Sequence, residues 1–178
     1  MTNLKQIKQI ISNIPDPEIP VITIKELGVL RKIEEKDKKI IVTITPTYSG
    51  CPAMDRFQKD IKEQLEALKV SSFEILLQYD PAWTTDWITD EAKKKLKKYG
   101  IAPPAHSTSD KTILMGQKQE VPCPRCNTKE TKLVSQFSST ACKAMYQCED
   151  YNFNFFTFNN FIIIWIKTFC FTIIKLNI

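Results

Sequence analysis

The stretch "TPTYSGCPAMDRFQKDIKEQL", residues 45–65, joins an extended segment to a helix through a Gly-Cys-Pro corner. Before the corner, residues 40–45 alternate in the manner of a β-strand. After it, apolar residues recur at helical spacing, which predicts an amphipathic helix running to about residue 69; they are Met54, Phe57, Ile61, Leu65 and Leu68. Because Pro52 suits the first turn of a helix, Cys51 is expected at or near the N-cap.

Cys51 therefore lies where backbone N–H groups are unpaired and the helix dipole favours negative charge, which lowers the pKa of a thiol. A thiolate is a soft ligand of the kind that iron and iron–sulfur clusters prefer. The first domain carries a single cysteine, so one chain cannot build a four-thiolate site there. A transient site completed by a partner or a second protomer stays open, and so does the alternative of a buried core cysteine.

The segments around this corner predict an α+β domain over residues 1–102, in the order helix, strand, strand, helix, strand, helix. Residues 3–14 have helical periodicity, and the prolines of "IPDPEIP" end that helix. Residues 73–79 alternate as a third strand. The last helix has Thr89 as its N-cap and Gly100 just beyond its final turn.

Composition limits the class of protein before any motif is considered. The 178 residues are 43% hydrophobic and 25% charged, which is typical of a globular chain. The net charge of +5 is too diffuse to predict nucleic-acid binding. The N-terminus has no apolar core of a signal peptide, so we expect a cytoplasmic location. In that reducing compartment six cysteines indicate metal or redox chemistry rather than disulfides.

After an expected linker at residues 103–120, which could hold a short strand at 112–115, a cysteine-rich module begins. In "CPRC", Cys123 and Cys126 have the spacing of a metal knuckle, since two thiolates two residues apart can reach one ion. Residues 121–150 are predicted to form a partial zinc-ribbon module. The alternative is a chance pair of cysteines in a loop.

The second knuckle of this module is incomplete. Cys148 follows Cys126 by 22 positions, and Tyr151 stands where a second CxxC would end. Cys142 is a substitute ligand by sequence, although five residues separate it from Cys148. Zinc is therefore a candidate cofactor at a site whose fourth ligand is in doubt.

The tail, residues 151–178, changes abruptly in composition. Of its 28 residues, 22 are Phe, Asn, Ile, Lys or Tyr, whose codons can be written wholly in A and T. We interpret it as a frameshifted or otherwise aberrant C-terminus. A membrane anchor is the alternative, but Phe161–Ile174 is short for a bilayer span and contains Lys167. No membrane association is expected.

Five ordered motifs give the chain a family resemblance: "DPEIPVITIKELGVL", "VTITPTYSGCPAM", "YDPAWTTDWITDEAKKKLKKYGIAPP", "CPRC" and "STACKAMYQC". Over about residues 6–150 the chain resembles the PaaD (PaaJ) proteins of phenylacetate degradation. These belong to the wider SufT-like, DUF59-type group of iron–sulfur assembly factors. Members of the family end in a second CxxC followed by an aromatic-rich strand, and this chain departs from that pattern at Tyr151.

The resemblance implies a non-catalytic accessory protein for the multicomponent oxygenase that epoxidises phenylacetyl-CoA, with Cys51 as a transient ligand for iron or an iron–sulfur cluster. The alternative is a structural subunit of that oxygenase without carrier activity. Asp16 and Glu18 match the family's "DPE" motif and would be supporting ligands, turn caps or partner contacts. The expected partners are the oxygenase subunits, with a homodimer left open.

Three other residues attract attention by their type. His106, the single histidine, falls in the expected linker and is interpreted as solvated. Trp83 and Trp87 flank a turn and are interpreted as packing residues rather than a ligand cage.

Overall fold

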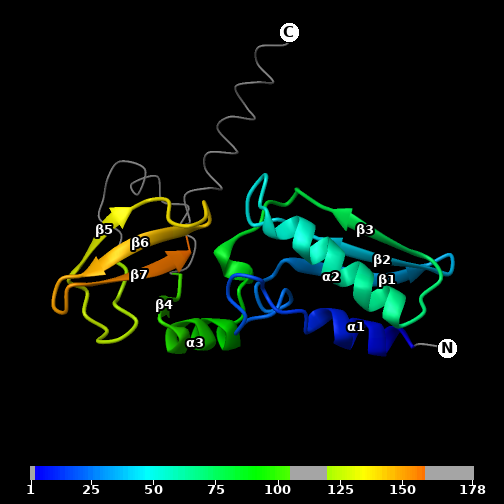
Figure 1. The fold of residues 1–178 in the computed structure, drawn as a ribbon, viewed down its shortest axis with the longest axis horizontal. Coiled ribbons are helices and arrows are strands. Elements are labelled where there is room, and N and C mark those ends of the chain that lie inside the picture. Colours follow the sequence, from blue (N-terminus) through cyan, green and yellow to red (C-terminus); the bar gives the residue numbers. More distant parts are fainter. Residues whose placement is uncertain (1–2, 105–119, 159–178) are drawn as a thin grey trace, which may run out of the picture. The chain divides into compact units, whose positions relative to one another are not determined.

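The computed structural model describes residues 3–104 and 120–158. The chain divides into two compact units, one of residues 1–83 with 87–92 and one of residues 84–86 with 93–178. Each unit has its own sheet and is described by itself (Figure 1).

The first unit is built on a three-stranded sheet of order β1-β2-β3. Strands β1 (Leu30–Lys36) and β2 (Lys39–Ile44) pair antiparallel, and β3 (Phe73–Leu77) pairs parallel to β2. The tight turn between β1 and β2 places Asp37 and Lys38 at positive φ. Because a parallel pair needs a long crossover, the chain passes through α2 (Ala53–Ala67) between β2 and β3.

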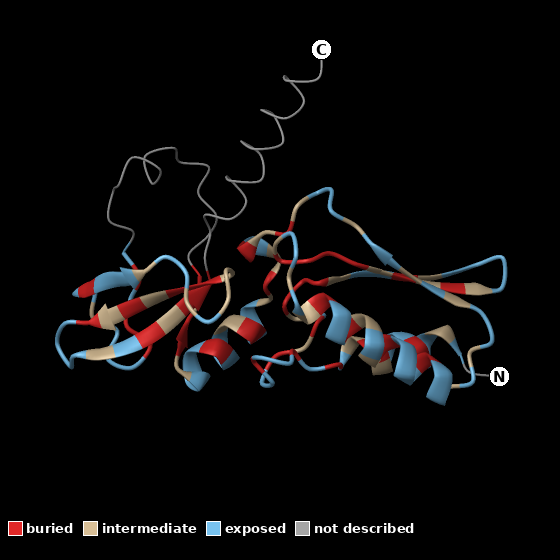
Figure 2. Ribbon diagram, turned by 45° about the horizontal axis from the view of Figure 1, so that its top comes forward, coloured by how far each residue is buried: buried red, intermediate tan, exposed pale blue. Residues whose placement is uncertain are grey.

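The core of this unit lies between the sheet and its helices. Helix α1 (Leu4–Ser12) buries Ile7 and Ile11, and α2 buries the apolar residues predicted from its periodicity up to Leu65. On β2 the buried residues alternate with half-buried ones, and the buried stripes of the elements are visible in Figure 2. The predicted α+β order of elements is confirmed.

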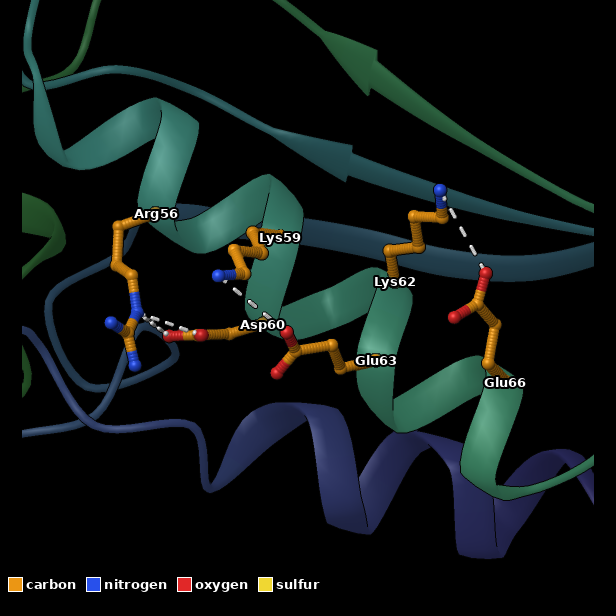
Figure 3. Close-up of polar contacts among 6 residues, drawn as sticks. All are labelled: Arg56, Lys59, Asp60, Lys62, Glu63 and Glu66. Atoms are coloured by element: carbon orange, nitrogen blue, oxygen red, sulfur yellow. Dashed lines mark hydrogen bonds and ion pairs between the residues drawn. The ribbon is translucent and has the colours of Figure 1, made fainter.

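The outer face of α2 is a solvated row of ion pairs (Figure 3). Each joins residues four apart; the pairs are Arg56–Asp60, Lys59–Glu63 and Lys62–Glu66. Solvent screens exposed pairs of this kind, so they contribute little to the stability of the fold. This face therefore keeps the helix soluble, while the opposite face carries the packing.

The last predicted helix is α3 (Asp90–Tyr99). The Thr89 hydroxyl accepts a hydrogen bond from the Ala92 N–H at 3.2 Å, as an N-cap does. Gly100 has φ 96°, the left-handed conformation expected just past a helix end. Both predicted ends of the helix are confirmed.

The second unit is a four-stranded sheet of order β4-β7-β6-β5. Its strands are β4 (Ile101–Ala102), β5 (Thr131–Ser135), β6 (Lys143–Cys148) and β7 (Phe153–Phe158). Strands β5, β6 and β7 pair antiparallel, and β4 pairs parallel to β7. This is the zinc-ribbon-like module that the cysteine spacing predicted.

Two boundaries differ from those predicted. The first unit was expected to end at residue 102, but β4 is hydrogen-bonded into the sheet of the second unit. The aberrant tail was expected to start at residue 151, but β7 completes the ribbon and buries Phe155 to 2% exposure in its core. The composition did not reveal this strand, because a segment enriched in Phe and Asn by codon bias cannot be distinguished by composition from an aromatic-rich strand.

Other expectations fall outside the described residues. They concern the strand at 112–115, His106 and the tail beyond residue 158. Within residues 3–104 and 120–158, no helix has the length and apolar character that crossing a bilayer requires.

Candidate functional site

The "DPE" loop of the first unit is closed by hydrogen bonds from its own backbone. The Ile24 N–H donates to the Ile14 carbonyl, and the Asp16 N–H donates to the Ile22 carbonyl, both at 2.9 Å. The Asp16 side chain accepts from the N–H groups of Glu18 and Ile19 at 2.9 and 2.8 Å. Asp16 is thus 7% exposed and caps the turn, as the capping alternative expected. Glu18 is exposed.

The next turn of this loop is held by a reciprocal pair of side chains. The Glu26 carboxylate accepts from the Thr23 N–H, and the Thr23 hydroxyl accepts from the Glu26 N–H, at 3.0 and 3.2 Å. This is the pattern of a capping box. The loop is therefore held in place by its own polar groups before any ligand arrives.

Cys51 lies in the turn just before α2. Its N–H donates to the Tyr48 carbonyl at 3.2 Å, and its carbonyl accepts from the Met54 N–H at 3.1 Å. The helix starts at Ala53, and Pro52 takes the N-cap position with helical dihedral angles. Cys51 is half-buried, and the Thr47 hydroxyl contacts its Sγ at 3.7 Å. The predicted position near the N-cap is correct to one residue.

The surroundings raise the pKa of the Cys51 thiol, contrary to the expected lowering. Burial is the largest cause, and the carboxylates of Glu18 and Asp16 add to it. Hydrogen bonds from the Thr47 hydroxyl and the Ala53 N–H act in the opposite direction but do not offset burial. The predicted lowering of the thiol pKa is therefore wrong, because burial of Cys51 outweighs the hydrogen bond from the N–H group at the start of the helix.

The electrostatic influence of Asp16 and Glu18 on the thiol places the "DPE" loop and Cys51 in one neighbourhood. The three side chains do not converge into a metal-binding group within the part of the chain that the structure describes. The Thr47 hydroxyl is a member of this neighbourhood that sequence reasoning missed. The short separation of four residues between Thr47 and Cys51 was the feature of the sequence that could have indicated this contact.

The cysteines of the second unit do converge. The Sγ atoms of Cys123, Cys126 and Cys148 all lie within 4.8 Å of one another, and those of Cys126 and Cys148 are 3.6 Å apart. The Arg125 N–H points at the Cys123 Sγ at 3.4 Å, as in a metal knuckle. Tetrahedral zinc with Zn–S bonds of ~2.3 Å requires sulfurs about 3.8 Å apart. The donor set and its spacing fit zinc, which these three residues would hold.

The structure does not bring the predicted substitute ligand, Cys142, into this group. Cys142 precedes β6 and Cys148 ends it. At ~3.3 Å per strand residue, about 20 Å of extended chain separates the two, so Cys142 cannot share the ion. Its Sγ instead contacts the Thr140 hydroxyl at 3.2 Å. Tyr151 is 70% exposed.

The two tryptophans pack within the first unit as interpreted. The Trp83 indole N–H donates to the Leu27 carbonyl at 2.9 Å, and the ring is buried. The Arg31 guanidinium lies 3.5 Å from the centre of the Trp87 ring. Gly28 has φ +75°, and a Cβ there would come within 2.5 Å of the Trp87 Cβ, so only glycine fits. These contacts fix the chain between β1 and the "DPE" loop.

Comparison with known proteins follows the same division into two units. A family model for iron–sulfur cluster assembly proteins matches residues 4–73, and a model of the PaaD zinc beta ribbon domain matches residues 107–155. A protein of Escherichia coli (strain K12), named as a subunit of 1,2-phenylacetyl-CoA epoxidase, is 44% identical over 144 residues, which cover 81% of this chain and 85% of the relative. The chain belongs to the PaaD family.

Two further matches each cover about half of this chain. A Porphyromonas gingivalis (strain ATCC BAA-308 / W83) protein named Fe-S protein maturation auxiliary factor is 32% identical over 94 residues, covering 52% of this chain and 89% of the relative. A solved DUF59 domain from Bacillus anthracis covers 52% of this chain and 89% of its own, with 23% identity and a TM-score of 0.47. The PaaD-type ribbon model extends past Tyr151 into β7, so the ribbon includes that strand.

Proposed function

We propose that this PaaD-family chain is a non-catalytic accessory factor in iron–sulfur centre assembly, and that its client is the multicomponent oxygenase that epoxidises phenylacetyl-CoA. The observation that carries the proposal is the half-buried Cys51 thiol beside the "DPE" loop, in the domain matched by the assembly model. The names of the two curated relatives, an epoxidase subunit and a maturation factor, support both halves of the proposal. We place the chain in the cytoplasm with its client.

Cys51 would act as a ligand that gains its charge only when metal arrives. Iron binding displaces the thiol proton, so the raised pKa makes capture weaker at low pH and stronger as pH rises. The Thr47 hydroxyl and the Ala53 N–H then stabilise the thiolate, while the carboxylates of Asp16 and Glu18 favour a nearby cation. The first domain offers one thiol, so the other ligands come from the partner or a second protomer, and the cargo leaves readily.

The test is the metal content of the client. The epoxidase is isolated from cells that carry the wild-type gene, no gene, Cys51→Ser or the control Cys142→Ser, and its iron and acid-labile sulfide are measured. We expect under-filled centres without the gene and with Cys51→Ser, and full centres with Cys142→Ser. Full metallation in the absence of this gene would overturn the proposal.

A structural subunit is the second candidate, favoured by the name of the Escherichia coli relative and by the raised pKa of Cys51. It predicts that the chain co-purifies with active epoxidase at fixed stoichiometry and that Cys51→Ser changes neither metallation nor activity. A carrier would instead dissociate from the mature complex.

A further inference from the structure

The two knuckles of the ribbon share a backbone feature that the sequence spacing does not show. In the first knuckle Asn127 follows Cys126 and has φ 63°. In the second, Asn152 follows Tyr151 and has φ 53°. A left-handed residue at the same offset gives both knuckles the same local backbone conformation, and non-glycine residues adopt it infrequently. The second knuckle thus keeps the backbone of a metal knuckle, with Tyr151 at its fourth ligand position.

Nothing in the described part of the chain fills that fourth position. The group of convergent ligand atoms contains three cysteine sulfurs and no carboxylate or imidazole of residues 3–104 or 120–158. Tyr151 is 70% exposed, and tyrosine is not among the usual zinc ligands. Cys126, in the first knuckle, is also exposed, so solvent reaches the group of three sulfurs from this side as well.

Reactive zinc sites have three protein ligands and one open coordination position, whereas structural zinc ribbons have four protein ligands. A soft metal held by thiolates favours a further thiolate over water. The closed "DPE" loop and Cys51 take no part in this site, so the inference does not depend on the proposed role of Cys51.

We propose that the ribbon binds zinc through Cys123, Cys126 and Cys148 and leaves one coordination position that takes an external low-molecular-weight thiol. The chain then carries a ligand-exchange site in addition to the thiol of its first unit. Binding forms one metal–sulfur bond, releases the water that held the position, and gives the thiol's proton to solvent.

The experiment uses Co²⁺ in place of zinc in the full-length chain, kept anaerobic with a phosphine reductant and titrated with glutathione against a protein-free blank. The thiolate-to-cobalt charge-transfer absorbance counts bound sulfurs, so it should rise by about a third as three thiolates become four. Tyr151→Cys should show the higher absorbance from the outset and gain nothing from glutathione. Tyr151→Phe should behave as wild type.

Further variants exclude other sulfur donors. A chain with Cys51, Cys142 and Cys170 all replaced by serine should match the wild-type spectrum and respond equally to glutathione. Loss of absorbance in this variant would show that another cysteine completes the site and would overturn the proposal. The proposal is equally overturned by four-thiolate absorbance in wild type without glutathione, by no response to glutathione, by loss of the band in Tyr151→Phe, or by absence of cobalt binding.

Discussion

The two units place cysteine in opposite surroundings. In the first, Cys51 is a half-buried thiol whose pKa is raised by burial and by carboxylates nearby. In the second, three cysteine sulfurs lie within 4.8 Å of one another, and a knuckle N–H points at one of them. The first environment favours the neutral thiol, and the second brings together sulfurs at a spacing that fits a zinc ion. Residue type alone does not decide what a cysteine does; the neighbours that the fold brings to it do.

Loss of a zinc ligand should change metal affinity more strongly than any other substitution considered below changes its own readout. Cys148→Ser should weaken zinc binding by a few hundredfold or more, since ~10–16 kcal/mol shared among the three cysteine ligands is about 3–5 kcal/mol per ligand. Competition with a colorimetric chelator measures it. Cys142→Ser is the matched control and should leave affinity unchanged, because it lies at the other end of β6. Equal losses in the two variants would contradict the assigned ligand set.

The next effect tests whether the "DPE" loop is held without metal. Asp16→Ala removes the acceptor of two backbone N–H groups and should lower the free energy of unfolding by about 1–2 kcal/mol. Asp16→Asn keeps an acceptor oxygen and should cost less. Denaturant unfolding of metal-free protein measures both, and similar costs for the two variants would show that charge rather than capping matters at this position.

A smaller effect concerns the electrostatics of Cys51. Glu18→Gln removes a carboxylate that raises the pKa of the thiol, so its alkylation rate at fixed pH should increase about twofold with the thiolate fraction. Mass spectrometry of iodoacetamide-treated protein follows Cys51 specifically. Glu35→Gln, near the end of β1, is the control and should leave the rate unchanged. A slower reaction in Glu18→Gln would reverse the assigned sign.

The smallest effect is a pH dependence of stability. The pKa of the Cys51 thiol is higher in the folded than in the unfolded chain, so the thiol stabilises the fold at pH values below its pKa in the unfolded chain. This contribution is lost as the pH rises through its pKa in the folded chain. Cys51→Ser should abolish that alkaline decline, whose size is below about 1 kcal/mol because the group is partly solvated. Urea titrations of both proteins from neutral to alkaline pH measure it, and an unchanged decline in the variant would assign it to another group.

The sequence predicted those parts of the fold that local patterns determine. Periodicity placed α2, Thr89 and Gly100 marked the ends of α3, and the CPRC spacing located the first knuckle. It failed where tertiary burial decides the outcome. The pKa of Cys51 depends on a carboxylate 33 positions earlier in the chain and on the burial around it. Strand β7 was missed because its partner β6 and its buried Phe155, rather than its composition, define it.

We propose that Cys51, and not the ribbon, passes on the cargo. The direct measurement preloads full-length wild-type, Cys51→Ser and Cys148→Ser chains with iron and sulfide under anaerobic conditions, and follows the visible absorption of an apo [2Fe–2S] acceptor protein. We expect Cys51→Ser to lose transfer and Cys148→Ser to retain it. Transfer that survives in Cys51→Ser but is lost in Cys148→Ser would contradict it.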